Sequence, residues 1–199
     1  MAEIARLLVQ LDEVAPPVRR IVEVPLNIRL DRLHLVIQAA MGWQNYHLYE
    51  FSIGRFIRVT PPSPGWSMPE TDTLSAAHTT LDGLLERIRA KSKSFKYNYD
   101  FGDDWQHTIK VQAISSADDG VAYPRLIAAE RACPPEDCGG APGYEAYVEA
   151  VTDPDHPDHE EMIEWRGPGF DPAAVDKKKI ESRLASLHKR WNRRKASPA

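Results

Sequence analysis

The chain has 199 residues, of which 42% are hydrophobic and 27% are charged, and its formal net charge is −4. These values are typical of a globular protein of about one domain. No apolar run approaches the ~18 residues of a membrane-spanning helix, and the first residues lack the cleavage site of a signal peptide. Two cysteines exclude a disulfide framework, so we expect a cytoplasmic location.

Charge is segregated along the chain. Residues 130–164 carry eleven carboxylates against one arginine, whereas residues 177–195 carry nine basic side chains against Glu181. The basic residues are Lys177, Lys178, Lys179, Arg183, Lys189, Arg190, Arg193, Arg194 and Lys195. We expect the two blocks either to pair, within one chain or between two, or to remain solvated faces. The basic block is the candidate surface for an acidic partner such as nucleic acid.

The first forty residues predict a hairpin followed by a helix. Two apolar runs with β-branched members, residues 4–11 and 18–24, are separated by two prolines, which favours an antiparallel hairpin. Asp31 then precedes an apolar face at i, i+3, i+4 and i+7 spacing that Gly42 closes. An acidic first turn and a terminal glycine are typical of a helix.

The middle of the chain is read mainly as strands. Further strands are predicted at residues 46–53, 55–59, 96–100 and 105–114. Residues 60–72 contain four of the sixteen prolines and predict an exposed loop. Residues 80–91 have leucines at helical spacing and predict a second helix.

The last third is predicted to be helical. Residues 123–143 look irregular, and helices are expected at residues 144–151, 156–165 and 176–193. Strands followed by helices predict an α+β fold, with a largely antiparallel sheet in the first two thirds and helices concentrated in the last third. The simplest partition is one domain over residues 1–176 and a basic helical tail over residues 177–199.

The sequence FGDD between two predicted strands has two interpretations. As a tight turn, it uses Gly102 for positive φ and aspartates to accept backbone hydrogen bonds. Alternatively, Asp103 and Asp104 supply oxygen ligands to a divalent cation. The kinase reading of Asp100-Phe101-Gly102 is excluded because the glycine-rich and catalytic loops are absent.

The two cysteines and two histidines have the composition of a zinc site. Cys133 and Cys138 are followed by His156 and His159, which together supply four ligands for a tetrahedral ion. Zinc is therefore the candidate cofactor. The alternative is that both cysteines pack in the interior and both histidines lie at the surface.

The remaining candidates have structural interpretations. His34, His47 and His107 are isolated in apolar or strand segments and are expected to be hydrogen-bonded structural residues. Gly139 and Gly140 precede a predicted helix and are expected to form a sharp turn.

Several stretches together resemble the plasmid ORF-three-like family, named from an open reading frame of a root-inducing plasmid. They are LHLVIQAAMGWQNYHLYEF, YNYDFGDDWQHTIKV, YPRLIAAERACPPEDCGGAPGY, DPDHPDHEEMIEW and GFDPAAVD, spread over residues 4–176. The resemblance implies an α+β fold and a largely uncharacterised family, some of whose members are labelled resolvase-like TnpR or insertion-element passenger proteins. This chain has no serine-recombinase pattern, and Tyr49 stands where relatives often carry histidine.

The resemblance implies that its shared residues cluster on one face of the fold. The expected binding surface consists of Asp100, Gly102, Asp103, Asp104, Trp105, His107, Glu136, Asp137, Gly139 and Gly140.

Two functions remain open. The first is a non-enzymatic binding or interaction module, associated with mobile-element or nucleic-acid biology through its basic tail. The alternative is a metal-dependent hydrolase or nuclease that uses the FGDDW and CPPEDCGG carboxylates, with His107 as general base, or the Cys/His zinc site. An enzyme requires these side chains to converge in space.

Overall fold

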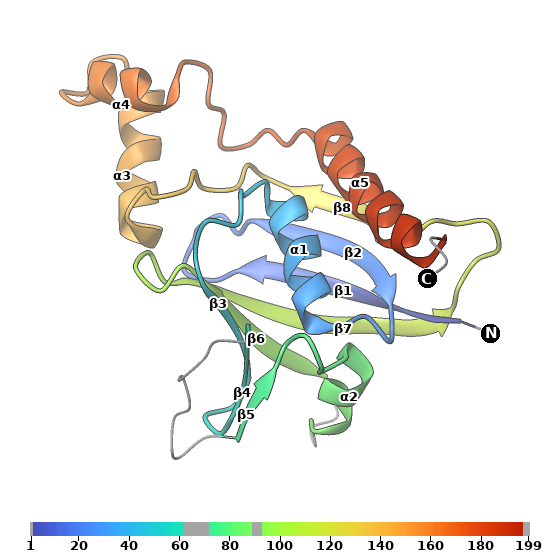
Figure 1. The fold of residues 1–199 in the computed structure, drawn as a ribbon. Coiled ribbons are helices and arrows are strands. Elements are labelled where there is room, and N and C mark those ends of the chain that lie inside the picture. The colour runs from blue at the N-terminus through green and yellow to red at the C-terminus, as the bar shows by residue number, and fades with distance from the viewer. Residues whose placement is uncertain (1, 62–71, 89–92, 197–199) are drawn as a thin grey trace.

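Eight strands form one sheet in the computed structural model, which describes residues 2–61, 72–88 and 93–196. The strands are β1 (Glu3–Leu11), β2 (Arg19–Pro25), β3 (Tyr49–Ile53), β4 (Ile57–Thr60), β5 (Asp72–Ser75), β6 (Ser94–Tyr99), β7 (Trp105–Ser116) and β8 (Arg125–Glu130). Their order is β5-β4-β3-β6-β7-β1-β2-β8, as Figure 1 shows. The pairing of β4 with β5 is parallel, and the other neighbours are antiparallel.

Five helices accompany the sheet. They are α1 (Leu30–Met41), α2 (Leu81–Glu86), α3 (Gly140–Thr152), α4 (His159–Arg166) and α5 (Lys177–Ala196). Helices α1 and α5 contact each other on one side of the sheet, whereas α3 and α4 form a separate pair at one end (Figure 1). The chain is thus a single α+β domain, as predicted. No helix in the described ranges is long and apolar enough to cross a membrane.

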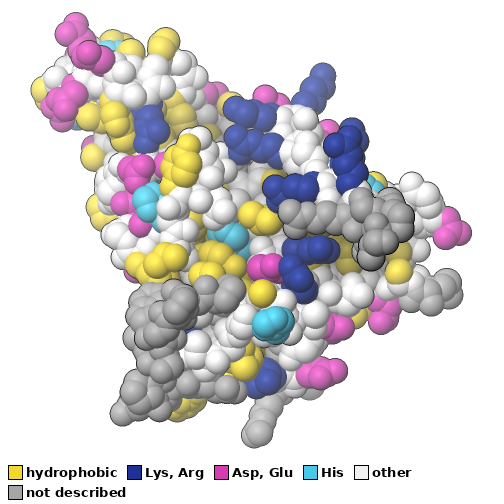
Figure 2. All heavy atoms as spheres, viewed as in Figure 1, with side chains coloured by type: hydrophobic (Ala, Val, Ile, Leu, Met, Phe, Trp, Pro, Cys, Tyr) yellow, Lys and Arg dark blue, Asp and Glu magenta, His cyan; other side chains and the backbone are white. Residues whose placement is uncertain are grey.

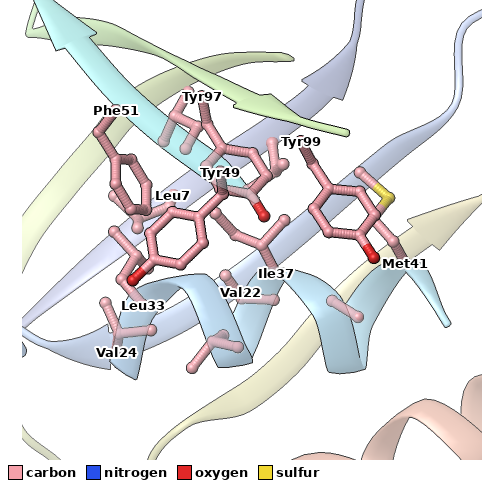
Figure 3. Packing of buried hydrophobic residues seen from close by; sticks show 14 of the residues in the cluster. Leu7, Val22, Val24, Leu33, Ile37, Met41, Tyr49, Phe51, Tyr97 and Tyr99 are labelled. Carbon is pink, nitrogen blue, oxygen red and sulfur yellow. The ribbon is translucent and has the colours of Figure 1, made fainter. Parts of the chain in front are cut away.

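The core lies between the sheet and α1. Alternate residues of β1, β6 and the first half of β7 are buried, such as Leu7 and Val9 of β1, because successive side chains point to opposite faces of a sheet. Figure 3 shows Tyr97 and Tyr99 of β6 reaching from the sheet toward Ile37 of α1. The opposite face carries polar residues, which is typical of an antiparallel sheet covered on one side.

Most predicted elements are present, with two differences. The hairpin, α1 with its end at Gly42 and the β6–β7 hairpin are confirmed. Residues 123–143, expected to be irregular, contain β8, which pairs with β2 at the edge of the sheet. The loop predicted over residues 60–72 falls mostly on residues 62–71, which lie outside the described residues, and β5 begins where it was expected to end. The helix predicted over residues 80–91 is present as α2, which is shorter and ends at Glu86. Residues 89–92 lie outside the described residues.

The basic helix α5 is amphipathic. Ile180, Leu184 and Leu187 are buried, and the helix packs on α1 and β8. Trp191 near its end lies under the guanidinium of Arg32, 5.1 Å from the ring centroid. No ion pair joins residues 177–193 to the acidic block in the described part of the chain. Pairing of the two blocks within one chain is therefore not observed, and Figure 2 shows Lys and Arg gathered over α5, away from the acidic α4 end.

Polar side chains are enclosed in this core. The hydroxyl of Tyr97 accepts from Gln38 Nε2 at 3.1 Å and lies 2.7 Å from His34 Nδ1. His34 Nε2 lies 2.5 Å from Asn45 Oδ1, and the Asn45 N–H donates to Gln38 Oε1 at 3.0 Å. These four contacts close a ring that fixes the loop after α1. His107 is fully buried, with Nδ1 2.9 Å from the Trp105 carbonyl oxygen.

The start of α3 rests directly on the β6–β7 turn. The Gly139 N–H donates to Asp103 Oδ2 at 3.2 Å. Gly140 has φ +70°, and a Cβ on it would lie 2.5 Å from the Asp103 carbonyl oxygen. A side chain at Gly140 would therefore push the two loops apart.

We expect Gly140→Ala to be much more destabilising than Gly120→Ala. Both glycines have positive φ, +70° and +74°, but Gly120 has nothing within 4 Å of an added Cβ. The difference in unfolding free energy between the two variants therefore measures the steric clash at Gly140. Overpacking of this kind costs about 1–3 kcal/mol. Urea unfolding of the two variants measures it, and equal losses would contradict the close packing of these loops.

We also expect stability to fall in mild acid. Burial lowers the pKa of both His34 and His107 to about 4, below the ordinary value of about 6.5. Between these values the unfolded chain binds more protons than the folded chain, so each histidine destabilises the fold by about 2 kcal/mol on going from about pH 7.5 to about pH 5.

Urea midpoints at the two pH values measure this loss. His107→Gln should remove about half of the histidine contribution, whereas a substitution of the exposed His78 by Gln should leave it unchanged. An unchanged pH dependence in His107→Gln would contradict the assignment.

Candidate functional site

Three segments far apart in the sequence meet at the end of β6. The first is the loop of residues 42–48, which follows α1, and the second is the turn of residues 100–104 between β6 and β7. The third is the segment of residues 131–139 before α3. These are the three motifs GWQNYHL, DFGDD and RACPPEDCG. Their convergence brings together side chains that have no proximity in the sequence.

One potential ligand comes from each segment. His47 Nε2 lies 3.0 Å from Asp137 Oδ1 and 3.5 Å from Asp100 Oδ2. The three ligand atoms all lie within 4.8 Å of one another. The side chain of Asp100 is 10% exposed, that of His47 is 29% exposed and that of Asp137 is 60% exposed. The group therefore opens to solvent on the Asp137 side.

The Nε2 atom of His47 lies within ion-pair distance of both carboxylates, and the same three groups could hold a metal ion. This nitrogen is buried and has no hydrogen-bond partner among the described residues, although two carboxylate oxygens are close. The nitrogen is thus not directed at either oxygen. An ion bound at about 2.0–2.2 Å would hold neighbouring ligand atoms roughly 3.0–3.5 Å apart. The two observed nitrogen–oxygen distances fall in this range.

Tyr99 and Glu136 connect the three segments behind the ligands. The Tyr99 hydroxyl accepts the Tyr46 N–H at 3.0 Å and donates to the Glu136 carboxylate at 3.2 Å. Glu136 is buried and also accepts the Gln44 N–H at 2.7 Å. Each ligand is the residue that follows a member of this cluster: Tyr46 precedes His47, Tyr99 precedes Asp100, and Glu136 precedes Asp137.

Further contacts keep these loops in place. Trp43 Nε1 donates to the Pro134 carbonyl oxygen at 3.0 Å, and Arg166 donates to the Glu136 carbonyl oxygen. Both carboxylate ligands have left-handed backbone, with φ +57° at Asp100 and +58° at Asp137. Such conformations are uncommon outside glycine, and they occur often at functional sites, where surrounding contacts maintain them.

The structure divides the predicted binding surface. Asp100 and Asp137 converge, but Asp103 accepts from Gly139, and Asp104 Oδ1 accepts from Asn98 Nδ2 and Gln106 Nε2 at 2.7 and 2.8 Å. The turn interpretation is thus confirmed for the hydrogen bonds of Asp103 and Asp104, but its glycine is wrong. Gly102 does not have a positive φ, and the left-handed residues of the turn are Asp100 and Asp104, with φ +57° and +54°. Gly102 donates to Asp100 Oδ1 at 3.0 Å, which orients that ligand.

Five of the ten predicted surface residues are buried: Asp100, Trp105, His107, Glu136 and Gly140. Trp105 is 1% exposed and His107 is fully buried, so neither lies on a binding surface. A general base must reach the substrate, and the buried His107 has no such access.

The predicted zinc ligands occupy separate contacts. His159 Nδ1 lies 2.7 Å from the Ala150 carbonyl oxygen, and His156 Nδ1 accepts the Asp158 N–H at 3.1 Å. Burial raises the pKa of the Cys133 thiol well above its ordinary value and that of Cys138 to about 12. No three of the four predicted ligands form a metal-ligating group in the described ranges. The zinc site at these four residues stays a prediction.

The sequence predicted structural roles for His34, His47 and His107. This prediction suits His34 and His107 but not His47. His34 and His107 are buried in hydrogen-bonded positions. His47 differs because its loop meets two carboxylates from elsewhere in the chain. The available signal was its place in the GWQNYHLYEF stretch, which belongs to the same family pattern as DFGDDW and CPPEDCGG.

Comparisons with known proteins identify the same family. The family model described as plasmid pRiA4b ORF-3-like protein matches residues 3–179. An uncharacterised protein y4hQ of Sinorhizobium fredii (strain NBRC 101917 / NGR234) is 43% identical over 195 residues, covering 98% of this chain and 97% of that protein. A crystal structure of MM3350 from Methanosarcina mazei Go1, a protein of unknown function, has 31% identity and a TM-score of 0.80. It covers 89% of this chain and 97% of its own. The chain belongs to the plasmid pRiA4b ORF-3-like family.

Proposed function

We propose that this protein is a hydrolase that uses a divalent metal ion, Zn²⁺ or Mn²⁺, bound by His47, Asp100 and Asp137. The observation that carries the proposal is the unbonded Nε2 of His47 between two carboxylate oxygens. Imidazole nitrogen is a common ligand of Zn²⁺, and carboxylate oxygen is a common ligand of Mn²⁺.

A catalytic role fits the ligand number. Structural zinc sites use four protein ligands, whereas catalytic sites use three and leave a position for water or substrate. A bound ion at such a position acts as a Lewis acid and lowers the pKa of a coordinated water, which supplies a nucleophile at neutral pH. The solvent-exposed Asp137 side would face the substrate.

Exposed apolar side chains beside two ligands support substrate contact. Tyr46 and Leu48 flank His47 and are 68% and 53% exposed, and Phe101 follows Asp100 and is 41% exposed. Apolar groups gathered at a polar site are typical of ligand-binding surfaces. The three side chains offer a rim on which a substrate could rest.

We expect purified chain to bind about one Zn²⁺ or Mn²⁺ ion, with His47→Ala and Asp137→Asn each weakening binding by more than about 100-fold, since each removes a direct ligand. Asp104→Asn is the matched control, because Asp104 lies in the same turn and its carboxylate bonds only to Asn98 and Gln106 in the described contacts. Calorimetric titration of metal-free protein measures the affinities.

Hydrolysis of p-nitrophenyl acetate and bis(p-nitrophenyl) phosphate then tests the activity. The rate should require metal, disappear in His47→Ala and persist in Asp104→Asn. Equal metal affinity in all three variants would contradict the site, and stoichiometric metal without hydrolysis of any tested ester or amide would leave a non-catalytic metal protein.

We propose nucleic-acid binding through α5 as a second, separate function. Lys178, Lys179, Lys189, Arg190 and Arg193 of α5 are exposed. None of them makes an ion pair with a described residue. A cationic helix face without carboxylate partners is suited to phosphate groups.

The salt dependence of binding to a 20-base-pair DNA duplex tests the role of α5. Replacing Lys189 and Arg193 by Ala should reduce the slope of log K against log salt concentration by about 2. The reason is that two phosphate contacts are lost and about two fewer counterions are released on binding. Replacing Lys110 by Ala, an exposed lysine of β7, should leave the slope unchanged. Absence of binding at low salt would contradict the proposal.

A further inference from the structure

A groove between α3 and α4 opens next to the candidate metal site. Its volume is about 370 Å³, and it is lined by Asp137, Tyr147, Asp158, Glu161, Met162 and Trp165, among others. Asp137 belongs to both the groove and the ligand group with His47. A molecule in the groove would therefore reach the open side of the metal site.

The groove is not filled by the packing of the two helices. Helix α4 buries none of its residues, although Asp158, Glu161, Met162 and Trp165 share the face that looks toward α3. Trp165 is 44% exposed. Helices that only support a fold normally bury one apolar stripe against their neighbour. Here Met162 packs only partly against the core and Trp165 meets Tyr147 by an edge, so both side chains also line the groove.

The lining has the chemistry of a site for an organic cation. The rings of Tyr147 and Trp165 meet edge to face, with centroids 5.8 Å apart and planes at 80°, and form an aromatic corner. The carboxylates of Asp158 and Glu161 make no ion pair with a described residue, and no lysine or arginine lines the groove. Aromatic faces combined with carboxylates attract ammonium groups.

The tryptophan already holds a cation in the folded chain. The Arg166 guanidinium lies 4.0 Å from the centroid of the Trp165 ring. One face of the Trp165 ring is therefore occupied by this guanidinium. An anionic ligand is disfavoured, because Asp137, Asp158 and Glu161 line the space and outnumber the one cation, Arg166, that lies against Trp165.

We infer that the groove binds an organic cation, an ammonium group carried on an aliphatic chain. The aliphatic part contacts Met162 and the aromatic rings, and the ammonium lies among the carboxylates of Asp158, Glu161 and Asp137. That this cation is part of the substrate rests on the proposed function. A phosphate ester or nucleic acid is then not the substrate held in this groove.

The test uses 1,5-diaminopentane as the probe, titrated into metal-free protein at physiological salt. The indole N–H of Trp165, assigned with Trp165→Phe, provides a local readout by two-dimensional ¹H–¹⁵N spectroscopy. We expect saturable movement of this signal with the diamine and none with glutarate or 1,5-pentanediol, which share the chain length but lack the positive charge.

Paired variants of α4 separate the groove from general surface charge. Glu161→Gln should weaken diamine binding by at least about fivefold, because it removes one facing carboxylate. Glu164→Gln removes the same charge from an exposed position of α4 that does not line the groove, and it should leave binding unchanged. Equal weakening by both variants, or equal binding of the diol, would overturn the inference.

The same experiment is independent of the metal proposal. His47→Ala should abolish metal binding and leave the diamine response intact. A diamine response without any metal binding would retain the groove and reject the hydrolase. Metal binding without a diamine response would retain the metal site and reject the cationic substrate.

Discussion

The hydroxyl of Tyr99 is the contact on which the arrangement of the site depends. It joins the loop after α1 to the segment before α3 through the Tyr46 N–H and the Glu136 carboxylate. Tyr99 itself cannot move, because it lies on the buried face of β6 and stacks on Trp43 with centroids 5.0 Å apart. Burial raises its pKa, so the hydroxyl stays protonated and continues to donate. The Tyr99 hydroxyl thereby connects the three loops to the sheet.

The two ends of the molecule have opposite chemistry. The acidic α3–α4 end includes the groove and the open side of the ligand group, whereas α5 presents lysines and arginines (Figure 2). Cationic small molecules and anionic polymers would therefore meet different surfaces of the same domain. Because α5 packs on α1, and α1 leads into the loop that carries His47, the two surfaces share one structural support.

Local patterns predicted the local structure well. Alternating apolar residues identified the β1–β2 and β6–β7 hairpins, and the Asp31-to-Gly42 spacing identified α1. Strand β8 was missed because RLIAAE is short and at the edge of the sheet, and its partner β2 lies about one hundred residues earlier. Two of the three candidate ligands, Asp100 and Asp137, were among the predicted surface residues, whereas His47 meets them only through tertiary folding. The cysteines were conspicuous by type, yet both are partly buried and pack against the core.

X-ray absorption at the zinc edge of zinc-loaded protein tests the central claim most directly, because it distinguishes sulfur from nitrogen and oxygen donors. The account predicts a first shell of nitrogen and oxygen atoms only, at about 2.0–2.2 Å, with one imidazole contribution that disappears in His47→Ala. A shell containing sulfur at about 2.3 Å would place the ion on Cys133 and Cys138 and would contradict the site at His47, Asp100 and Asp137.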